Sequence, residues 1–464
     1  MDLTPIIKIN EKRQKSVCDP ANKFFWGDTE KILFLSKVNK LEPKGGKKEF
    51  ILLITLAQIT IIKAKTKVKY EIERSINIIS VVKVNYVEPE LVTITAQDQN
   101  SQDLSFTFQA PELALDIAKT IVHIRTIFNY GTSIFPLKVE STPQTALVAP
   151  KFTQRPPNAL RIRLIQYAKL YNYPDILKDI QYLDEWDKKP TPLLKLGSVF
   201  NSSDNSNAAT VYGSAISIDP DVKFIHFDNF LPQYSYKALK PIFERSETIV
   251  KATFENYRIQ DADKQTFNLP SHPNTKLIDL IFRDCDPSYT FAVIQGLAKF
   301  NGKFKSLTLV KIPFPTETFQ PLFDAFSRFT CFSQLFTLRF EEGTANKLTY
   351  DVFEQYMPSL KMKNLSINKS TLDVSHLSKA VLCKSQGIKV LTLQGNKLLA
   401  MPDPALIFPE CLNLLDLSRS SIKPSSFKSF LQILFTKPRK RLITLYMCNL
   451  TNISKNESLV DCFN

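Results

Sequence analysis

The chain has 464 residues, of which 44% are hydrophobic and 11% are aromatic. This length and composition exclude an intrinsically disordered protein and predict two or three folded domains. The 60 lysines and arginines outnumber the 45 aspartates and glutamates, and the net charge of +15 favours an anionic partner, either a nucleic acid or an acidic membrane surface.

Several functional classes lack their usual signals. The sequence has neither of the glycine-rich patterns GxGxxG and GxxxxGK[ST], and its four histidines are scattered singly. We therefore predict a protein that is not an enzyme, with no catalytic residue, no metal ligand and no cofactor. The seven widely spaced cysteines favour a reducing compartment. Without an apolar stretch long enough for a signal peptide or a membrane-spanning helix, the chain is expected to be soluble.

Residues 31–110 have the pattern of seven short strands, rich in Ile, Val, Phe and Thr and separated by polar turns. A helix is predicted after Pro111, because apolar residues such as Ile117 and Ile121 then recur at helical spacing. Seven strands followed by one amphipathic helix resemble a pleckstrin homology (PH) domain. Residues 1–130 are accordingly predicted to form a PH-like β-barrel with a C-terminal helix.

Lysines are concentrated in this first region, where twelve basic residues and four acidic residues lie between positions 31 and 83. In the stretch KAKTKVKY, residues 63–70, lysine occupies every second position, so an extended chain would place four ammonium groups on one face. The resemblance to PH domains implies that basic residues near the first strands hold acidic lipid headgroups. The predicted lipid-binding residues are Lys37, Lys40, Lys44, Lys47, Lys48, Lys63, Lys65, Lys67 and Lys69.

The residues alone leave three interpretations of these lysines open: a solvated strand face, a surface for an anionic membrane, or a surface for nucleic acid. A lysine near an anionic leaflet contributes about 1 kcal/mol, so several together would hold a protein weakly and in a salt-sensitive way. Nucleic acid is the least expected partner, because Tyr70 is the one aromatic residue placed among these lysines to stack on bases.

The middle of the chain is predicted to connect two domains. Residues 136–157 carry five prolines among small polar residues, which indicates a linker. Residues 158–189 have the pattern of helices, and residues 201–209 have the composition of a polar loop. Residues 131–221 are therefore predicted to be a proline-containing linker and a helical connector.

From residue 222 onward the pattern LxxLxLxxNxL recurs nine times, with substitutions, at intervals of 24 to 31 residues. This is the period of leucine-rich repeats, which supply a strand and a helix per repeat. Residues 222–464 are predicted to form a horseshoe with strands inside and helices outside, so the predicted fold class is multidomain α/β. The first residues of the central LxL motifs are Ile225, Ala252, Leu280, Leu307, Leu338, Leu365, Leu391, Leu415 and Leu445.

Along each repeat strand, the residues between and just after the LxL positions are predicted to face the concave surface, which is the expected protein-binding face. Cys285 occupies the position usually held by the ladder asparagine, and it is predicted to be a buried structural thiol rather than a nucleophile. The predicted protein-binding residues are His226, Asp228, Glu255, Arg283, Arg339, Glu341, Asn368, Gln394, Asp416 and Tyr446.

The order of PH-like domain, helical connector and leucine-rich repeats resembles the CARMIL family of actin-regulatory scaffolds. The stretches FILLITLAQITIIKAKTKVKYEIERSINIISVV, LIQYAKLYNYPDILKDIQYLDEW and VKFIHFDNF carry the likeness. The resemblance implies a non-enzymatic scaffold in the cytoplasm, peripheral at the plasma membrane or cell cortex. Its expected partners are anionic membrane lipids and a cytoskeletal protein on the concave repeat face, through which it acts on actin filament organisation, with no nucleic acid.

The sequence departs from that family after the ninth repeat, where the long tail with the capping-protein motif is absent, so binding of capping protein is not expected. The alternative is a leucine-rich repeat adaptor or inhibitor that binds one protein partner without using a membrane. Binding to lipid vesicles discriminates between the two.

Overall fold

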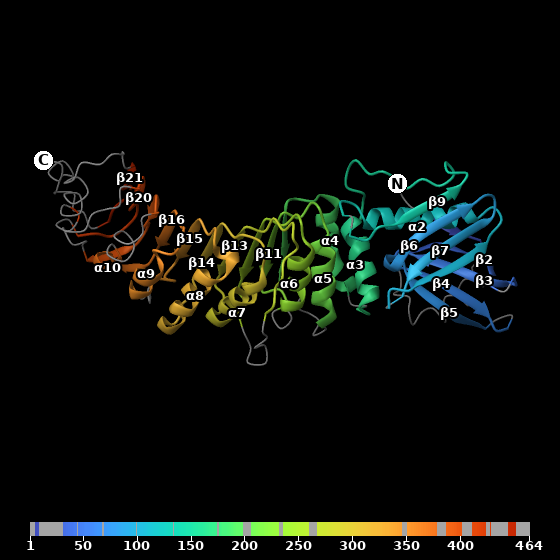
Figure 1. Cartoon of the computed structure of the whole chain (residues 1–464), viewed down its shortest axis with the longest axis horizontal. Coiled ribbons are helices and arrows are strands. Elements are labelled where there is room, and N and C mark those ends of the chain that lie inside the picture. The colour runs from blue at the N-terminus through green and yellow to red at the C-terminus, as the bar shows by residue number, and fades with distance from the viewer. Residues whose placement is uncertain are drawn as a thin grey trace. The chain divides into compact units, whose positions relative to one another are not determined.

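The structure, a computed structural model, divides into two compact units (Figure 1). The first unit comprises Met1–Thr191 and Ser202–Asp221, and the second comprises Pro192–Asn201 and Val222–Asn464. The protein is mixed α/β, with an antiparallel sheet in the first unit and a parallel sheet in the second. The structure describes residues 5–8, 31–43, 45–66, 69–98, 100–132, 134–173, 176–197, 206–231, 235–258, 267–345, 350–377, 387–400, 411–423, 427 and 444–451.

The first unit is built on a nine-stranded sheet in the order β5-β4-β3-β2-β8-β7-β6-β9, with β1 paired to β2 beside this path. The seven strands predicted between residues 31 and 110 are all present, and their neighbours along the chain pair antiparallel where they are joined by short turns. The strands are β1 (Ile6–Ile7), β2 (Ile32–Leu41), β3 (Lys47–Thr55), β4 (Gln58–Ala64), β5 (Tyr70–Asn77), β6 (Val81–Val87), β7 (Leu91–Gln97), β8 (Asp103–Gln109) and β9 (Lys138–Thr142).

Helix α2 (Ala114–Phe128) follows the last antiparallel strand, as predicted, and contacts β6 and β7. It starts three residues after Pro111, because Glu112 takes a left-handed conformation with φ 62° that a helix cannot contain. The apolar stripe that predicted the helix is its buried face, where Ile117, Ile121 and Phe128 are all fully buried.

The predicted linker was wrong at residues 138–142, which form strand β9. This strand pairs in parallel with β6, with Val84 opposite Val139, and it is the last strand in the order of the sheet. An ion pair of 2.7 Å between Lys83 and Glu140 joins the same two strands. The surrounding prolines suggested a linker, but five residues between them are enough to form an edge strand that pairs with the backbone of β6.

The predicted helical connector belongs to the first unit. It consists of α3 (Ala159–Leu170), α4 (Ile176–Lys188) and α5 (Ser206–Ser217), and α3 contacts α2, α4 and α5. The polar loop predicted for residues 201–209 was wrong from Ser206 onward, because Ala208 and Ala209 are buried in α5. The predicted domain boundary at residue 130 therefore falls inside one compact unit.

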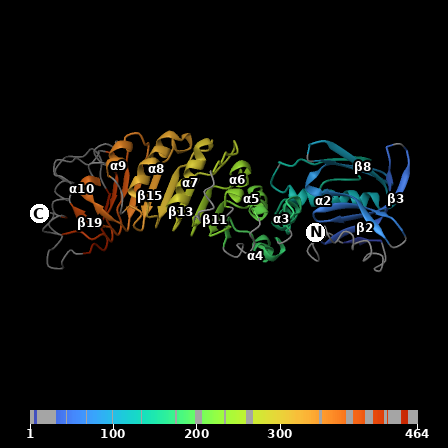
Figure 2. The ribbon, with the colours of Figure 1, turned by 90° about the horizontal axis from the view of Figure 1, so that it is seen from below.

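The second unit contains a ten-stranded parallel sheet in which each strand pairs with the next strand of the sheet along the chain (Figure 2). All nine predicted repeats lie on it in the predicted register: Ile225 pairs with Ala252, and the pairing continues to Leu445. The strands are β10 (Leu193–Leu196), β11 (Phe224–Asp228), β12 (Lys251–Glu255), β13 (Asp279–Arg283), β14 (Ser306–Val310), β15 (Thr337–Glu341), β16 (Asn364–Asn368), β18 (Val390–Thr392), β20 (Leu414–Asp416) and β21 (Thr444–Tyr446).

The parallel sheet begins earlier than residue 222, which corrects the predicted boundary. Strand β10 pairs with β11, with Leu194 opposite Ile225 and Leu196 opposite Phe227. Leu194 and Leu196 are both fully buried, so they fill the two inward positions of an additional repeat strand. The motif LLKL was missed because it is short and is separated from the other copies by the helix α5.

One backbone turn recurs after the strands of this sheet. In the strands of this sheet from β11 to β21, the residue four positions after the first inward residue has a positive φ, between 49° and 65°. These residues are Asn229, Asn256, Asp284, Lys311, Glu342, Lys369, Gly395, Arg419 and Asn449. A left-handed residue at the same position of each repeat turns the chain by the same amount, so the following segments leave the sheet in the same direction.

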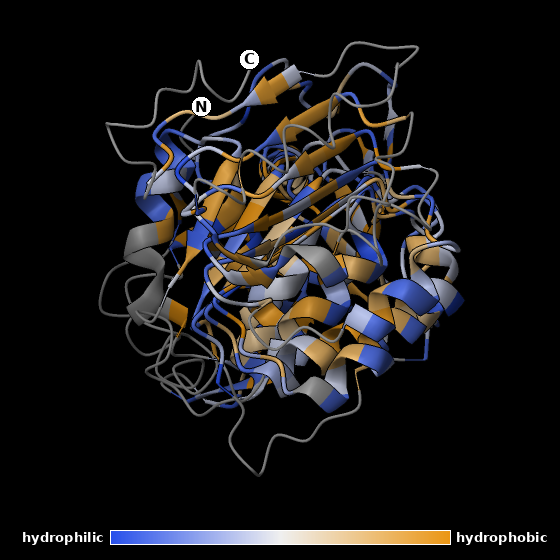
Figure 3. Cartoon of the chain, turned by 90° about the vertical axis from the view of Figure 1, so that its left-hand side faces the viewer, coloured by the Kyte–Doolittle hydropathy of each residue, from blue (hydrophilic) through white to orange (hydrophobic). Residues whose placement is uncertain are grey.

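Helices follow several of these strands and cover their inward side: α6 (Ser235–Arg245), α7 (Pro287–Gly296), α8 (Thr316–Arg328), α9 (Tyr350–Tyr356) and the short α10 (Val374–Leu377). Rings of Phe227, Phe254 and Phe282 stack between neighbouring strands at 5.5 and 5.0 Å. Helix residues contact the same layer, as Phe353 of α9 does with Phe340 of β15. Two short strands, β17 (Thr371–Asp373) and β19 (Lys397–Ala400), form a separate parallel pair. Figure 3 shows the strands mostly in the orange of hydrophobic residues, whereas the helices carry both orange and blue residues.

Candidate lipid-facing and protein-binding surfaces

Two hairpin turns bring most of the predicted lipid-binding lysines to one end of the first sheet. The turn between β2 and β3 is closed by the Glu42 backbone N–H, which donates to the Gly46 carbonyl at 2.8 Å. The turn between β4 and β5 is closed by the Lys65 N–H, which donates to the Lys69 carbonyl at 2.8 Å. Because β3 and β4 are antiparallel, the start of β3 lies beside the end of β4, and both turns lie at the same end.

The stretch KAKTKVKY is not one extended strand, which corrects the expectation that its four lysines share a strand face. Lys63 lies in β4, Lys65 lies in the turn and Lys69 directly precedes β5. The chain reverses here because the Thr66 hydroxyl accepts a hydrogen bond from the Lys69 N–H at 3.0 Å, a local bond that favours a turn over a strand. The lysine row therefore forms a hairpin tip.

Three of the predicted lipid-binding lysines are already paired with carboxylates. Lys37 contacts Glu49, Lys65 contacts Glu71, and Lys40 contacts Glu73, each with 2.6 Å between the nitrogen and the oxygen. Lys40 also lies 3.6 Å from Glu42, and its ammonium group lies 5.3 Å from the ring centroid of Phe50. All four acidic residues of this region are thus used in neutralising three lysines.

Four other lysines at the same end remain available to an anion. Lys47, Lys48, Lys63 and Lys69 are exposed, and they form no ion pair with any residue that the structure describes. We call them the tip lysines. Lys48 pairs across the strands with Lys40, and Lys63 lies one strand further along. The predicted lipid-binding residues Lys44 and Lys67 lie outside the described residues.

The ten predicted protein-binding residues all belong to the outward face of the parallel sheet, opposite the apolar side chains of the LxL motifs. Several are paired along the sheet: His226 contacts Glu255 at 2.8 Å, and Asp228 accepts a hydrogen bond from Asn256 at 2.8 Å. The side chain of Asn368 accepts a bond from the backbone N–H of Gln394 at 3.0 Å. Contacts between neighbouring strands thus hold several of these residues in place.

The exposure of these residues differs strongly along the sheet. Arg283, Arg339, Gln394 and Tyr446 are exposed and can meet a partner directly. Asp416 is 9% exposed, accepts hydrogen bonds from the Ser418 N–H and the Gln394 side chain, and has its carboxylate largely satisfied within the sheet. It is therefore a poorer contact residue than its outward position predicted.

Cys285 is a buried thiol, as predicted. Its sulfur donates to the carbonyl oxygen of Phe254 at 3.3 Å, across to the neighbouring strand, and the residue is 1% exposed. Burial raises the pKa of this thiol to about 12, so the thiol stays protonated at neutral pH. Asn396 fills the corresponding position two strands before the end of the sheet, where its side chain donates to the Ile367 carbonyl at 2.6 Å.

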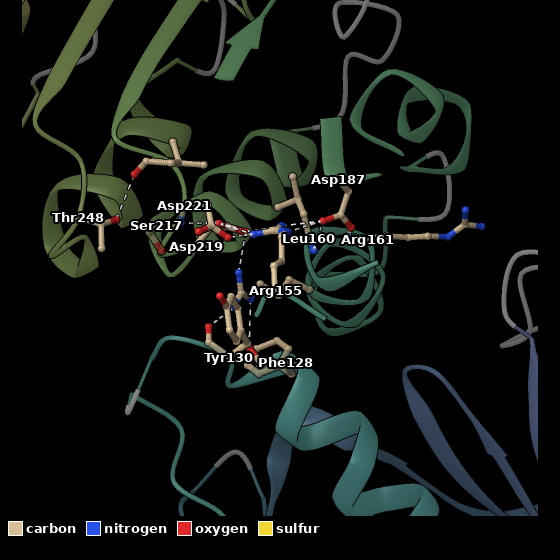
Figure 4. A network of polar contacts seen from close by, with 12 residues as sticks. Phe128, Tyr130, Arg155, Leu160, Arg161, Asp187, Ser217, Asp219, Asp221 and Thr248 are labelled. Atoms are coloured by element: carbon tan, nitrogen blue, oxygen red, sulfur yellow. Dashed lines mark hydrogen bonds and ion pairs between the residues drawn. The ribbon is translucent and has the colours of Figure 1, made fainter. Parts of the chain in front are cut away.

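A buried ionic network in the first unit was not predicted from the sequence (Figure 4). Arg163 is fully buried and donates to Asp219 at 2.7 Å and to the carbonyl oxygens of Phe128 and Tyr130. Arg155 contacts Asp219 at 2.9 Å and, in addition, Asp187 and Asp221, each at 2.6 Å.

The network ties the helices of the first unit together. Asp187 of α4 accepts bonds from the backbone N–H groups of Leu160 and Arg161, at the start of α3, in addition to Arg155. Burial alone would raise the pKa of Asp219, but the adjacent charges of Arg163 and Arg155 outweigh it and hold the pKa below its ordinary value. No local spacing could have indicated the network, because its partners are separated by up to 66 positions in the chain.

Two kinds of feature are absent from the described residues. No group of three or more His, Cys, Asp or Glu side chains is placed to hold a metal ion among them. None of the helices they form is both long and apolar enough to cross a bilayer.

The chain matches no model of a known protein family and no curated protein. Function is therefore inferred from the side chains themselves.

Proposed function

We propose that the protein is a non-enzymatic, membrane-associated scaffold. In this proposal the first unit is a PH-like domain that docks on anionic lipid, and the second is a leucine-rich repeat horseshoe that binds a cytoskeletal protein. The chain would then link the plasma membrane to actin filament organisation, as the likeness to the CARMIL family implies. The observation that carries the proposal is the set of tip lysines, four exposed and unpaired cations at two neighbouring hairpin turns among the described residues.

The charge balance at this end of the sheet favours an external anion. The four carboxylates of the region are all engaged with Lys37, Lys40 and Lys65, so no acidic group remains there to neutralise the tip lysines. A flat anionic surface can contact both turns at once. Each lysine near such a surface contributes about 1 kcal/mol, enough in sum for weak and reversible recruitment.

The fold of the first unit supports a PH-like barrel. β5 and β8 are separated by three strands in the sheet order, yet the guanidinium of Arg74 lies 5.4 Å from the ring centroid of Phe106. The ion pair between Lys40 of β2 and Glu73 of β5 joins strands that are separated by two others in the order. Both contacts require a sheet that curls on itself. Helix α2 packs against β6 and β7.

The second unit supports a leucine-rich repeat fold. Its strands pair in parallel and in one register, and the two inward positions of every strand from β11 to β20 are buried apolar residues. The outward face is polar and carries charges of both signs. A repeat array of this kind presents a long surface suited to a protein partner.

The test is cosedimentation of the full chain with vesicles of phosphatidylcholine, with and without phosphatidylserine. We expect binding to the acidic vesicles alone, lost in raised salt. Replacement of Lys47, Lys48, Lys63 and Lys69 with alanine should weaken it by about tenfold or more and leave the fold intact, since the four unpaired charges repel one another. The matched control replaces Lys119, Lys138, Lys151 and Lys189, four exposed lysines on other parts of the first unit.

The control variant loses the same net charge but should keep its vesicle binding, because the Debye length is about 8 Å at physiological salt. Equal binding to neutral and acidic vesicles, or equal losses in the two variants, would contradict the membrane role.

One observation favours a second function, an adaptor or inhibitor that binds a single protein and no membrane. Lys37, Lys40 and Lys65 contact carboxylates at 2.6 Å and are less available to lipid than the sequence predicted. Absence of vesicle binding in the unmodified chain would select this function.

A further inference from the structure

The strands of the second unit carry a row of basic residues along the edge where they begin. Lys305, Phe336, Lys363 and Lys389 each lie two positions before the first inward residue of β14, β15, β16 and β18. Backbone hydrogen bonds join each of these residues to the next. The Phe336 N–H donates to the Lys305 carbonyl at 2.9 Å, and the Lys363 N–H donates to the Phe336 carbonyl at 3.0 Å. The Lys389 N–H donates to the Lys363 carbonyl at 2.8 Å. We call this row the basic rim.

The outward residues at the starts of the four rim strands carry no acidic group. On the neighbouring strand β13, the carboxylate of Asp279 lies opposite Ser306 and 3.8 Å from Lys251. Arg339, on β15, is exposed and lies between Thr308 and Ser366 on the neighbouring strands. The other outward positions at the starts of these four strands are Ser306, Thr337, Asn364, Val390 and Thr392, which carry no charge. Carboxylates appear only toward the far ends of the strands, at Glu341 and beyond.

Among the described residues, the rim cations have no carboxylate partner, whereas several other cations of the second unit do. Elsewhere Glu342 lies 3.2 Å from both Lys311 and Lys369, and Arg258 contacts Asp284 at 2.9 Å. By contrast, Lys305, Lys363, Lys389 and Arg339 form no ion pair within the described part of the chain. Four cations without partners on neighbouring strands repel one another and are suited to an external anion.

An exposed aromatic ring interrupts the row of cations. Phe336 is 42% exposed, between Lys305 on one side and Lys363 on the other, and the ammonium group of Lys363 lies 5.3 Å from its ring centroid. A surface for a purely polar anion, such as free phosphate, gains little from this ring. A polypeptide that carries an apolar side chain between acidic ones can use the ring and the cations together.

We propose that the basic rim, with Arg339, is the docking surface for an acidic polypeptide segment in which an apolar residue lies between carboxylates. Neighbouring strands lie about 4.8 Å apart, so the four strands span about 15 Å, the length of roughly five extended residues. Alternate side chains of an extended segment are about 7 Å apart and can reach lysines one or two strands away. The inference deepens the proposed function, on whose protein-binding role for the second unit it rests.

The experiment measures fluorescence anisotropy of the full chain with a labelled peptide of glutamates around one phenylalanine. The same peptide with alanine in place of phenylalanine is measured in parallel. We expect salt-sensitive binding of the first peptide and weaker binding of the second. Replacement of Lys305, Lys363 and Lys389 with glutamate should reduce the affinity at least about tenfold, because attraction becomes repulsion. Phe336→Ala should weaken binding of the phenylalanine peptide and leave that of the alanine peptide unchanged.

The matched control replaces Lys237, Lys240 and Lys299, three exposed lysines outside the sheet, with glutamate, and should keep its affinity. Failure of both peptides to bind, or equal losses in the rim and control variants, overturns the proposal. Loss of acidic-vesicle binding in the rim variant with unchanged peptide binding also overturns it and assigns the rim to a membrane. The tip-lysine variant separates the two proposals, because it should lose vesicle binding and keep peptide binding.

Discussion

Arg163 joins helix α3 to the end of α2 and to Asp219, which follows α5. It is fully buried and paired with the equally buried Asp219 at 2.7 Å. Removal of Arg163 leaves Asp219 with Arg155 but takes away one of its buried cations and the donor to the Phe128 and Tyr130 carbonyls. Loss of a member of a buried ionic network costs about 3–5 kcal/mol. Breaking a partly exposed pair costs at most about 1 kcal/mol.

We therefore expect Arg163→Met to lower the free energy of unfolding of the first unit by about 3–5 kcal/mol. Arg161→Met, in the same helix, removes an arginine that contacts Asp184 at the partly exposed surface and serves as the control. Its effect should be at most about 1 kcal/mol. Denaturant unfolding of both variants checks this, and equal effects would mean that the buried network contributes no more than a surface pair.

Acid should weaken the first unit through Asp219. Its pKa in the folded state lies below the ordinary value of 3.8, so its stabilising contribution is complete above that value and is lost as the pH falls through the lowered pKa. We expect the free energy of unfolding to fall steeply below about pH 4. In Asp219→Asn, which has no proton to gain at this position, stability should depend less on pH in that range. Unfolding curves at stepped pH measure the difference, and parallel profiles would count against Asp219.

Strand β9 and helix α3 decide where the first unit can be cut. A fragment of residues 1–130 loses the edge strand that pairs with β6, and it loses the Phe135 carbonyl that accepts a bond from the buried Arg125 at 3.0 Å. The contact between Gln166 of α3 and the Leu56 carbonyl is lost as well. We expect residues 1–221 to unfold cooperatively on heating and residues 1–130 to aggregate or melt without a transition. A cooperative melt of the shorter fragment would restore the predicted boundary.

Strand β16 allows a test of the register in the parallel sheet. Leu365 points inward and is fully buried, whereas its neighbour Asn364 points outward and is half-buried. Leu365→Asp places an unpaired charge in the apolar layer and should cost more than about 4 kcal/mol. Asn364→Asp introduces the same charge one position away and should change stability by less than about 1 kcal/mol. Thermal unfolding compares the two, and similar losses would show that the alternation is misassigned.

Periodic features of the sequence predicted the structure well. The LxL motifs place Leu391 and Leu415 in directly paired inward positions, because a hydrophobic repeat fixes both the strand and its register. Single strands without a repeat were harder to predict: β9 lies among prolines and β10 carries only LLKL. These two segments form strands because each pairs with a partner strand, and no local sequence pattern identifies that partner.

The positions of the predicted surface residues in the strands were easier to predict than the ion pairs that they form. The described lysines of the predicted lipid site lie at one end of the sheet, except Lys37, which lies within β2 opposite Ile51. Lys40 is paired with Glu73, which is 33 residues away in the chain. The basic rim was missed because its lysines are far apart in the sequence. The pairing of neighbouring strands brings them side by side. Ion pairing depends on which strands become neighbours, so it could not be predicted from the sequence.

The chain-order pairing of the parallel sheet has a mechanical consequence. Each strand is bonded only to its neighbours in the order of the sheet, so a pulling force on the ends of the second unit can detach one repeat without breaking the next. Every detached repeat of 24 to 31 residues adds about 80–110 Å of extended chain. Under tension the unit should therefore lengthen in steps, and it would act as an extensible tether whose remaining repeats stay folded while load is taken up.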